Sequence, residues 1–245
     1  MKIIDMHTHT GNKRIHLALA TLERMLKKYG IDNAAVFPMF QDSCDALVEE
    51  SIRNSKNTSG FFFPFLRFNP TEMKLGMLEE ISPHFSGFKF HPRAENFNVF
   101  DKRLEKIFDF IESTGKPVII HSRKENNCNS DPDRLVRIAG LYPGINFIFA
   151  HFANDSDEFF REAAEYENAY VETSIVSSPK IIERRVDEIG AERFVFGSDT
   201  PFSDPEIELL KITKSRLTKM QKESILSKNA FTLLKRRKRR QYIRV

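Results

Sequence analysis

The chain has 245 residues, of which 40% are hydrophobic and 29% are charged, a balance that is ordinary for a globular protein. No apolar run reaches the roughly 18 residues that a membrane-spanning helix needs, and the two cysteines form neither a CxxC pair nor a disulfide framework. We therefore expect a cytoplasmic protein without a secretory leader.

Positive charge is concentrated at the C-terminus. Residues 235–245 contain seven of the 38 Lys and Arg residues and none of the 34 acidic ones, so the formal net charge of +4 becomes about −3 without them. Blocks of like charge are usually solvated tails. We expect a basic tail here, with nucleic acid or an anionic lipid surface as the alternative partner.

Short apolar runs rich in β-branched and aromatic residues recur along the chain, with starts roughly 22 to 31 residues apart. Each run is nearly continuous, which is typical of parallel strands buried on both faces. We predict strands over residues 2–9, 31–40, 61–68, 86–92, 116–122, 145–152, 168–174 and 192–199.

Helical patterns lie between these runs. Asp131 followed by Pro132 is typical of a helix start, and Gly30 and Gly115 are expected at helix C-caps. We predict helices over residues 16–30, 102–116, 131–144, 155–168, 178–190, 204–215 and about 217–236.

Eight strands that alternate with helices indicate an α/β fold of the parallel (β/α)8 TIM-barrel type. An open doubly wound sheet is the alternative, and the missing GxGxxG turn after the first strand argues against it. No linker-like or low-complexity stretch divides the chain. We therefore expect one barrel domain over residues 1–234, followed by the tail.

Five of the seven histidines stand where predicted strands end. In a barrel, these C-terminal strand ends form one mouth, so we expect residues far apart in sequence to converge there. Histidines two apart on a strand point the same way, and paired imidazoles suit a metal ion. The histidines at strand ends are His7, His9, His91, His121 and His151, whereas His16 and His84 lie elsewhere.

Asp199 follows the eighth predicted strand, in FGSDTPF. A carboxylate at the mouth can complete a metal site with three histidines, and it can accept a proton from water. The alternative is a turn or N-cap aspartate before Pro201. Together with the strand-end histidines, Asp199 favours the metal site.

Six stretches in chain order carry a family resemblance: KIIDMHTH, GFKFHP, VIIHS, FIFAH, FGSDTPF and ILSKNAFTLL (225–234). Together they resemble the amidohydrolase superfamily, and most closely its amidohydrolase-2 branch of metal-dependent hydrolases and decarboxylases. The resemblance spans about residues 2–234.

The resemblance implies a metal site and a catalytic pair. The histidine after the sixth strand, His151, would contact the substrate or the hydrolytic water, and Asp199 would also accept the proton. The ion would be zinc, with manganese or iron as alternatives. The implied metal ligands are His7, His9, His121 and Asp199.

Four further residues are candidate substrate-binding groups. Lys89 ends the fourth strand, where some relatives carry a carboxylated lysine that bridges two metals; a substrate anion is its other expected partner. His91 would share the face of Lys89, or else be a loop histidine. Arg67 and Arg123 follow the third and fifth strands, where either could bind a substrate carboxylate or be solvated.

Two interior acids complete the set. Asp5 faces the same way as His7 but one layer deeper, which indicates a buried hydrogen-bonded acid and not a ligand. Glu172, in YVETS, is an interior candidate of the same standing.

The implied reaction is hydrolysis of an amide, ester or lactone-like carbonyl by water activated on the metal, with non-oxidative decarboxylation left open. The expected partner is a small molecule, which could carry a carboxylate, and homo-oligomers are open. One alternative is a TatD-like deoxyribonuclease, although that group carries a glutamate after strand four, where this chain has GFKFHP. The other is a non-catalytic barrel that binds a partner through residues 235–245.

Overall fold

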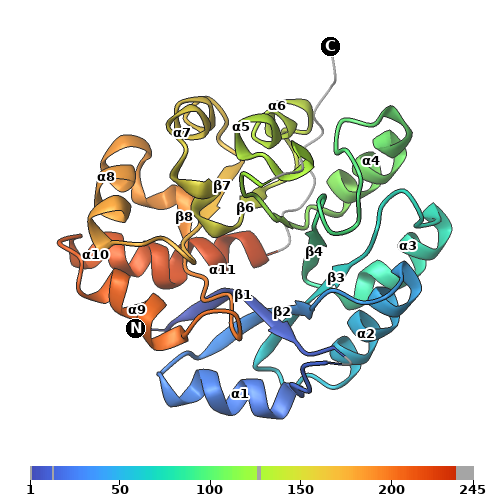
Figure 1. Cartoon of the computed structure of the whole chain (residues 1–245), viewed down its shortest axis with the longest axis horizontal. Helices are drawn as coiled ribbons and strands as arrows, with labels where there is room; N and C mark the ends of the chain where they lie inside the picture. Colours follow the sequence, from blue (N-terminus) through green and yellow to red (C-terminus); the bar gives the residue numbers. More distant parts are fainter. Residues whose placement is uncertain (1, 13, 126–127, 236–245) are drawn as a thin grey trace.

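The computed structural model describes residues 2–12, 14–125 and 128–235, so the predicted basic tail lies, apart from Lys235, outside the described residues. Figure 1 shows a ring of helices around a central set of strands. Across these described ranges, no helix combines the length and apolar character needed to cross a bilayer.

The strands form one parallel sheet in sequence order, as predicted. The first and last strands meet through backbone hydrogen bonds, in which Met6 N donates to Phe196 O (2.8 Å) and His9 N donates to Thr200 O (2.8 Å). The (β/α)8 barrel is confirmed. Its strands are β1 (Ile4–Thr10), β2 (Asn33–Pro38), β3 (Phe62–Arg67), β4 (Gly87–Phe90), β5 (Val118–Ile120), β6 (Phe147–Phe149), β7 (Ala169–Glu172) and β8 (Phe194–Val195).

Helices follow the strands, including two that the sequence patterns did not locate, α2 and α3. The predicted helix over 131–144 is divided into two short helices, and a π-helical turn, Ser224–Lys228, interrupts the last one. The α-helices are α1 (Leu19–Lys28), α2 (Cys44–Lys56), α3 (Leu75–Ile81), α4 (Glu105–Thr114), α5 (Pro132–Leu135), α6 (Ile138–Leu141), α7 (Asp157–Ala163), α8 (Pro179–Ile189), α9 (Pro205–Thr213), α10 (Lys219–Glu223) and α11 (Asn229–Leu234).

The predicted helix ends have clear local causes. The Asp131 side chain accepts a hydrogen bond from Asp133 N and caps α5, with Pro132 at its first position. Gly115 caps α4 with a φ of +65°, a left-handed conformation that favours glycine. At α1 the prediction was one residue late, because Tyr29 is the C-cap and Gly30 follows it.

Two apolar layers hold the barrel together. A small inner cluster fills the space inside the strands, with Met6, Phe37 and Phe65 among its members. A larger outer cluster packs the other strand faces against the helices. The inner layer is tight, because a Cβ at Gly87 would lie 2.2 Å from the ring of Phe65. The chemistry-bearing side chains therefore lie above a packed core, and not in a pore.

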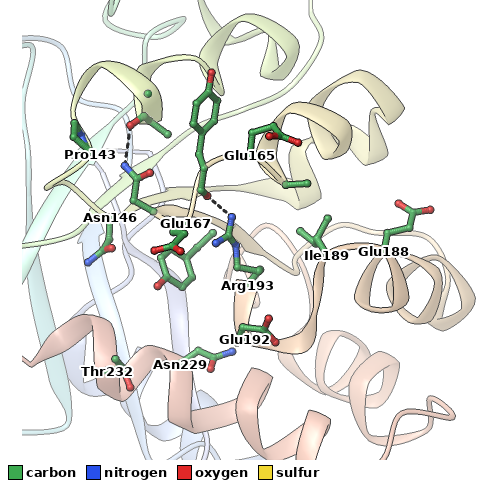
Figure 2. A pocket seen from close by; sticks show the side chains of 16 residues that line it. Pro143, Asn146, Glu165, Glu167, Glu188, Ile189, Glu192, Arg193, Asn229 and Thr232 are labelled. Atoms are coloured by element: carbon green, nitrogen blue, oxygen red, sulfur yellow. Dashed lines mark hydrogen bonds between the residues drawn. The ribbon is translucent and has the colours of Figure 1, made fainter.

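The opposite end of the barrel is hollowed by a cavity of about 1040 Å³ near the start of β6, β7 and β8. Figure 2 shows this cavity, with Asn229 and Thr232 of α11 along one edge. Two of its polar side chains donate hydrogen bonds to backbone carbonyls. Asn229 Nδ2 donates to those of Ala191 and Phe194, and Arg193 donates to those of Ala163 and Tyr166. These bonds tie the loops at this end together, which indicates a structural role.

Arg185 of α8 forms a buried ionic junction, with 3% of its side chain exposed. Its guanidinium lies 2.7 Å from Asp155 Oδ1 and 2.7 Å from Glu188 Oε2, and it stacks 4.3 Å above the Phe160 ring. We expect Arg185→Ala to lower the free energy of unfolding by about 2–3 kcal/mol, as measured by urea denaturation.

Arg184→Ala is the matched control, because Arg184 also pairs with Asp155 but is 51% exposed. It should change the free energy of unfolding by less than about 0.5 kcal/mol. Equal losses for the two variants would show that burial of Arg185 is not what stabilises the junction.

Candidate active site

The strand ends converge as the sequence predicted. A cavity of about 560 Å³ opens at the C-terminal ends of the strands. It is lined by every predicted site residue, together with several that were not predicted. The predicted ones are His7, His9, Arg67, Lys89, His91, His121, Arg123, His151 and Asp199.

Asp199 lies between the two histidines of β1. Its Oδ1 is 3.2 Å from His7 Nε2 and 3.1 Å from His9 Nε2. The aspartate has a left-handed backbone (φ +57°), and its N–H donates to the carbonyl of His7 at 2.7 Å. A sparsely populated conformation held by a backbone bond to β1 fixes where this carboxylate lies.

His121 and His151 form a second pair beside the first. His151 Nε2 lies 2.9 Å from His121 Nδ1, and the ring of His91 stacks on that of His121 with centroids 3.7 Å apart. By ligand-atom distance alone, the cluster in the described chain that could hold a metal is His7, His151 and Asp199, all within 4.8 Å of one another. His151 was predicted to contact the substrate or the hydrolytic water. The structure also places one of its ring nitrogens within 4.8 Å of possible ligand atoms of His7 and Asp199.

Two fully buried acids contact His7, the first of the β1 histidines. Glu172 Oε2 lies 2.8 Å from His7 Nδ1, and Asp5 Oδ1 accepts hydrogen bonds from the backbone N–H groups of His7 (3.0 Å) and Ser198 (2.9 Å). Burial raises the pKa of Asp5 to about 7. Asp5 is therefore the buried hydrogen-bonded acid that the sequence indicated, joining β1 to the segment after β8.

The chemistry of these donors fits a divalent metal ion. Burial lowers the pKa of the cavity imidazoles well below its usual value, so they are neutral, which is the form that binds metals. Burial and the nearby Glu172 raise the pKa of Asp199. Two imidazole nitrogens lie within 3.2 Å of one carboxylate oxygen. These three atoms are of the kinds that bind a divalent metal ion.

Lys89 brings a buried cation to the same cavity. Its side chain is 1% exposed, and Nζ has no hydrogen-bond partner among the described residues. The amine lies 4.7 Å from the Phe37 ring centroid. Burial and the neighbouring Arg67 lower the pKa of Lys89. A buried amine without a hydrogen-bond partner lowers the stability of the fold unless a ligand pairs with it.

Arg67 differs from Lys89 because it has an internal partner. Its guanidinium lies 2.6 Å from Glu95 Oε1 and donates to the carbonyl of Pro38 at 3.1 Å. Glu95 also accepts the His91 N–H at 3.0 Å, and so holds the loop after β4. No sequence pattern pointed to Glu95, because it stands in an irregular loop.

The rim of the cavity is apolar, which the sequence analysis did not anticipate. Phe40, Ile175 and Phe202 line it and are 54%, 39% and 61% exposed. These side chains come from the loops after β2, β7 and β8. The cavity therefore combines a polar, histidine-rich floor with an entrance at which these apolar side chains lie beside the Arg93–Glu125 ion pair.

We expect Glu95→Gln to lower the free energy of unfolding by about 2–3 kcal/mol, because it leaves the buried Arg67 cation unpaired. Glu50→Gln, which affects a surface pair with Arg53, should cost less than about 0.5 kcal/mol. Adding Arg67→Met to Glu95→Gln should recover part of the loss in chemical denaturation. No recovery would contradict the view that the charge pair is the source of the effect.

Solved structures share this fold. An uncharacterised TIM-barrel protein from Bordetella bronchiseptica is 17% identical, with a TM-score of 0.79, and the alignment covers 96% of this chain and 98% of that one. A dihydroxybenzoic acid decarboxylase from Polaromonas sp. JS666, with bound manganese and 2-nitroresorcinol, is 13% identical (TM-score 0.77; 96% and 97% covered). A protein from Pseudomonas putida described as a 2-pyrone-4,6-dicarboxylic acid hydrolase is 14% identical (TM-score 0.72; 95% and 97% covered).

A search of curated proteins found no significant match. The family model described as Amidohydrolase matches residues 4–236, nearly the whole chain. With the barrel and the strand-end histidines in place, this match shows that the chain belongs to the amidohydrolase family of enzymes.

Proposed function

We propose that this enzyme uses a divalent metal ion to hydrolyse an amide, ester or lactone-like carbonyl in a small molecule that carries a carboxylate. One observation carries the proposal: in a single cavity at the strand ends, Asp199 contacts two imidazoles within 3.2 Å, and beside them lies a buried lysine that has no hydrogen-bond partner among the described residues. The family match supports this type of activity.

The proposed metal ligands are those that the sequence predicted. The ion would act as a Lewis acid toward water and the substrate carbonyl. Zinc is the first candidate, with manganese and iron to be tested beside it. The residues that hold the ion are His7, His9, His121 and Asp199.

Asp199 is the proposed proton carrier. Its Oδ1 lies beside the Nε2 atoms of the two β1 histidines and would bind the ion with them, whereas Oδ2 lies 3.9 Å from His151 Nδ1. Oδ2 would accept the proton of the attacking water and return it to the leaving group. His151 would orient the reacting oxygen beside Oδ2.

Substrate recognition is assigned to the cations and the rim. Lys89 would bind a substrate carboxylate through Nζ, with Arg123 and His91 at the side of the same cavity. Arg67 would act on the substrate mainly by raising the local positive potential, since its guanidinium is held by Glu95. The apolar rim would accept the body of the substrate.

Decarboxylation is the second candidate reaction, since the manganese-bound relative is a decarboxylase. A buried cation beside a metal site would serve a carboxylate substrate in either reaction. We also propose that residues 1–234 form one catalytic domain, that the enzyme acts in the cytoplasm, and that a nucleic acid is not its substrate.

We expect His7→Ala and Asp199→Asn to lose most bound metal, and Asp199→Asn to lower kcat by about 10²- to 10⁴-fold. Metal content measured by mass spectrometry, with turnover of a panel of lactones, amides and aromatic acids, tests both. Asp187→Asn, on the exposed face of α8, is the control and should match the unmodified enzyme.

The panel also separates the alternatives. Acid release without carbon dioxide supports hydrolysis, and carbon dioxide release supports decarboxylation. Cleavage of single-stranded DNA in place of either would overturn the proposal, as would a protein that binds no divalent metal.

We expect Lys89→Met to raise KM for a carboxylate substrate by about 10- to 100-fold, the size expected for one charge-assisted hydrogen bond. The neutral methyl ester of the same substrate should be affected far less. Steady-state kinetics with the two substrates check this, and an equal loss on both would remove the anion-binding role from Lys89.

A further inference from the structure

A set of hydrogen bonds links three imidazoles of the cavity, those of His7, His151 and His121, to one fully buried carboxylate, that of Glu172. Its Oε2 lies 2.8 Å from His7 Nδ1, 2.8 Å from Ser174 Oγ and 3.1 Å from the backbone N of His151. Its Oε1 accepts the backbone N–H of Ser174. Four contacts from three residues therefore converge on this carboxylate, two of them from backbone amides.

The position of Glu172 is fixed from the other side by Gly197. A Cβ at position 197 would lie 2.3 Å from Glu172 Oε1. The backbone after β8 therefore packs directly against the carboxylate, in space that a side chain would fill. Glu172 is thus enclosed by β1, β6, β7 and the end of β8, and it has little freedom to choose other partners.

The donors can be assigned around this carboxylate. Each oxygen of this carboxylate already accepts a backbone N–H, from Ser174 and from His151. With Glu172 as the acceptor, His7 Nδ1 carries a hydrogen, and the Ser174 hydroxyl gives its one hydrogen to Glu172. Ser174 Oγ is then an acceptor for His151 Nδ1, which lies 3.2 Å away. His151 Nδ1 therefore also carries a hydrogen.

The same logic extends to His121. A neutral His151 protonated at Nδ1 has a lone pair on Nε2, and His121 Nδ1 lies 2.9 Å from it. His121 Nδ1 must supply the hydrogen between them. The Nε2 of His121 is then a bare lone pair, and it is buried without a hydrogen-bond partner among the described residues.

We propose that Glu172 and Ser174 are positioning residues that fix His7, His151 and His121 in the tautomer protonated at Nδ1. Nε2 of His7 and Nε2 of His121 are thereby presented as lone pairs for a metal ion. In His151, by contrast, Nε2 accepts from His121, and Nδ1, whose hydrogen goes to Ser174, also lies 3.9 Å from Asp199 Oδ2. Proximity alone groups His151 with His7 and Asp199, but the hydrogen bonds select His121 as the ligand.

His91 provides an internal reference of the opposite kind. Its Nδ1 accepts the backbone N–H of Ala94 at 3.3 Å, so the neutral ring carries its hydrogen on Nε2. The exposed His16 and His84 should show the exchange-averaged signals of solvated histidines. A single spectrum is therefore expected to contain both tautomers, one at His91 and the other at His7, His121 and His151.

Long-range ¹H–¹⁵N NMR of the full chain labelled with ¹⁵N-histidine tests the assignment, with chelator and again with zinc. We expect His7, His121 and His151 to be protonated at Nδ1 and His91 at Nε2. Ser174→Ala should remove the single tautomer of His151 and His121 while leaving that of His7. Ser174→Thr, which keeps a hydroxyl, should restore it.

Ser122→Ala is the matched control, because Ser122 is a buried serine at the same end of the barrel whose hydroxyl donates to Ala150 O at 2.6 Å. It should leave every tautomer unchanged. A hydrogen on Nε2 of His121 or His151 in the unmodified protein would overturn the proposal, and so would a Ser174→Ala spectrum identical to that of the control.

Metal affinity gives an independent readout. Removing a carboxylate that orients a ligating histidine typically weakens binding by about 10- to 100-fold, and we expect this loss for Glu172→Gln in zinc competition with a chromophoric chelator. Ser174→Ala should weaken binding less, because His7 keeps its partner. If Glu172→Gln does not fold, the spectra of the Ser174 variants and of the unmodified protein still test the tautomer assignment.

The metal-binding part rests on the proposed function, whereas the tautomer assignment does not. A protein that shows the expected tautomers but binds no metal would refute the proposed function and leave the relay intact. A protein that binds zinc and turns over substrate with a different tautomer pattern would refute the relay alone.

Discussion

The contact between Asp199 and the two β1 histidines depends on closure of the whole barrel. Asp199 stands at the end of the last strand and His7 and His9 stand on the first, yet Oδ1 lies within 3.2 Å of both imidazoles. The same junction carries backbone bonds, including Asp199 N to His7 O. Because these side chains come from the first and last strands of the barrel, the site forms only when those strands meet, and binding of a metal there would stabilise that closure.

This closure places several polar groups in the interior, and the two acids beneath the site have specific partners there. Asp5 accepts two backbone N–H groups across the junction, and Glu172 accepts groups from β1, β6 and β7. Buried polar groups cost stability unless they are paired. The barrel thus pairs Glu172 and Asp5 Oδ1 within the fold. Among the described residues that line the cavity, Lys89 Nζ and His121 Nε2 are left without a hydrogen-bond partner and could be completed by a ligand.

The sequence predicted the parts of this arrangement that follow from periodicity and from strand topology. Continuous apolar runs predicted the eight strands. Because the C-terminal ends of barrel strands form one mouth, the sequence also predicted that His7, His121 and Asp199 lie close together. It did not locate α2 or the loop that carries Glu95, where the pattern is irregular. It also could not reveal the part played by Ser174, because the choice of tautomer depends on which atoms lie within hydrogen-bond reach, and residue spacing does not specify this.

Arg67 and Lys89 show why such contacts decide function. They are paired in register on β3 and β4, and both were candidates for binding a substrate anion. In the folded chain, Glu95 reaches back from the loop after β4 to Arg67, and Lys89 has no hydrogen-bond partner among the described residues. Two residues that looked alike in the sequence thus differ in the structure. Arg67 is paired with Glu95 inside the protein, whereas Lys89 is free to pair with a ligand. The loop after β4 therefore neutralises one of these two neighbouring positive charges and leaves the other facing the cavity.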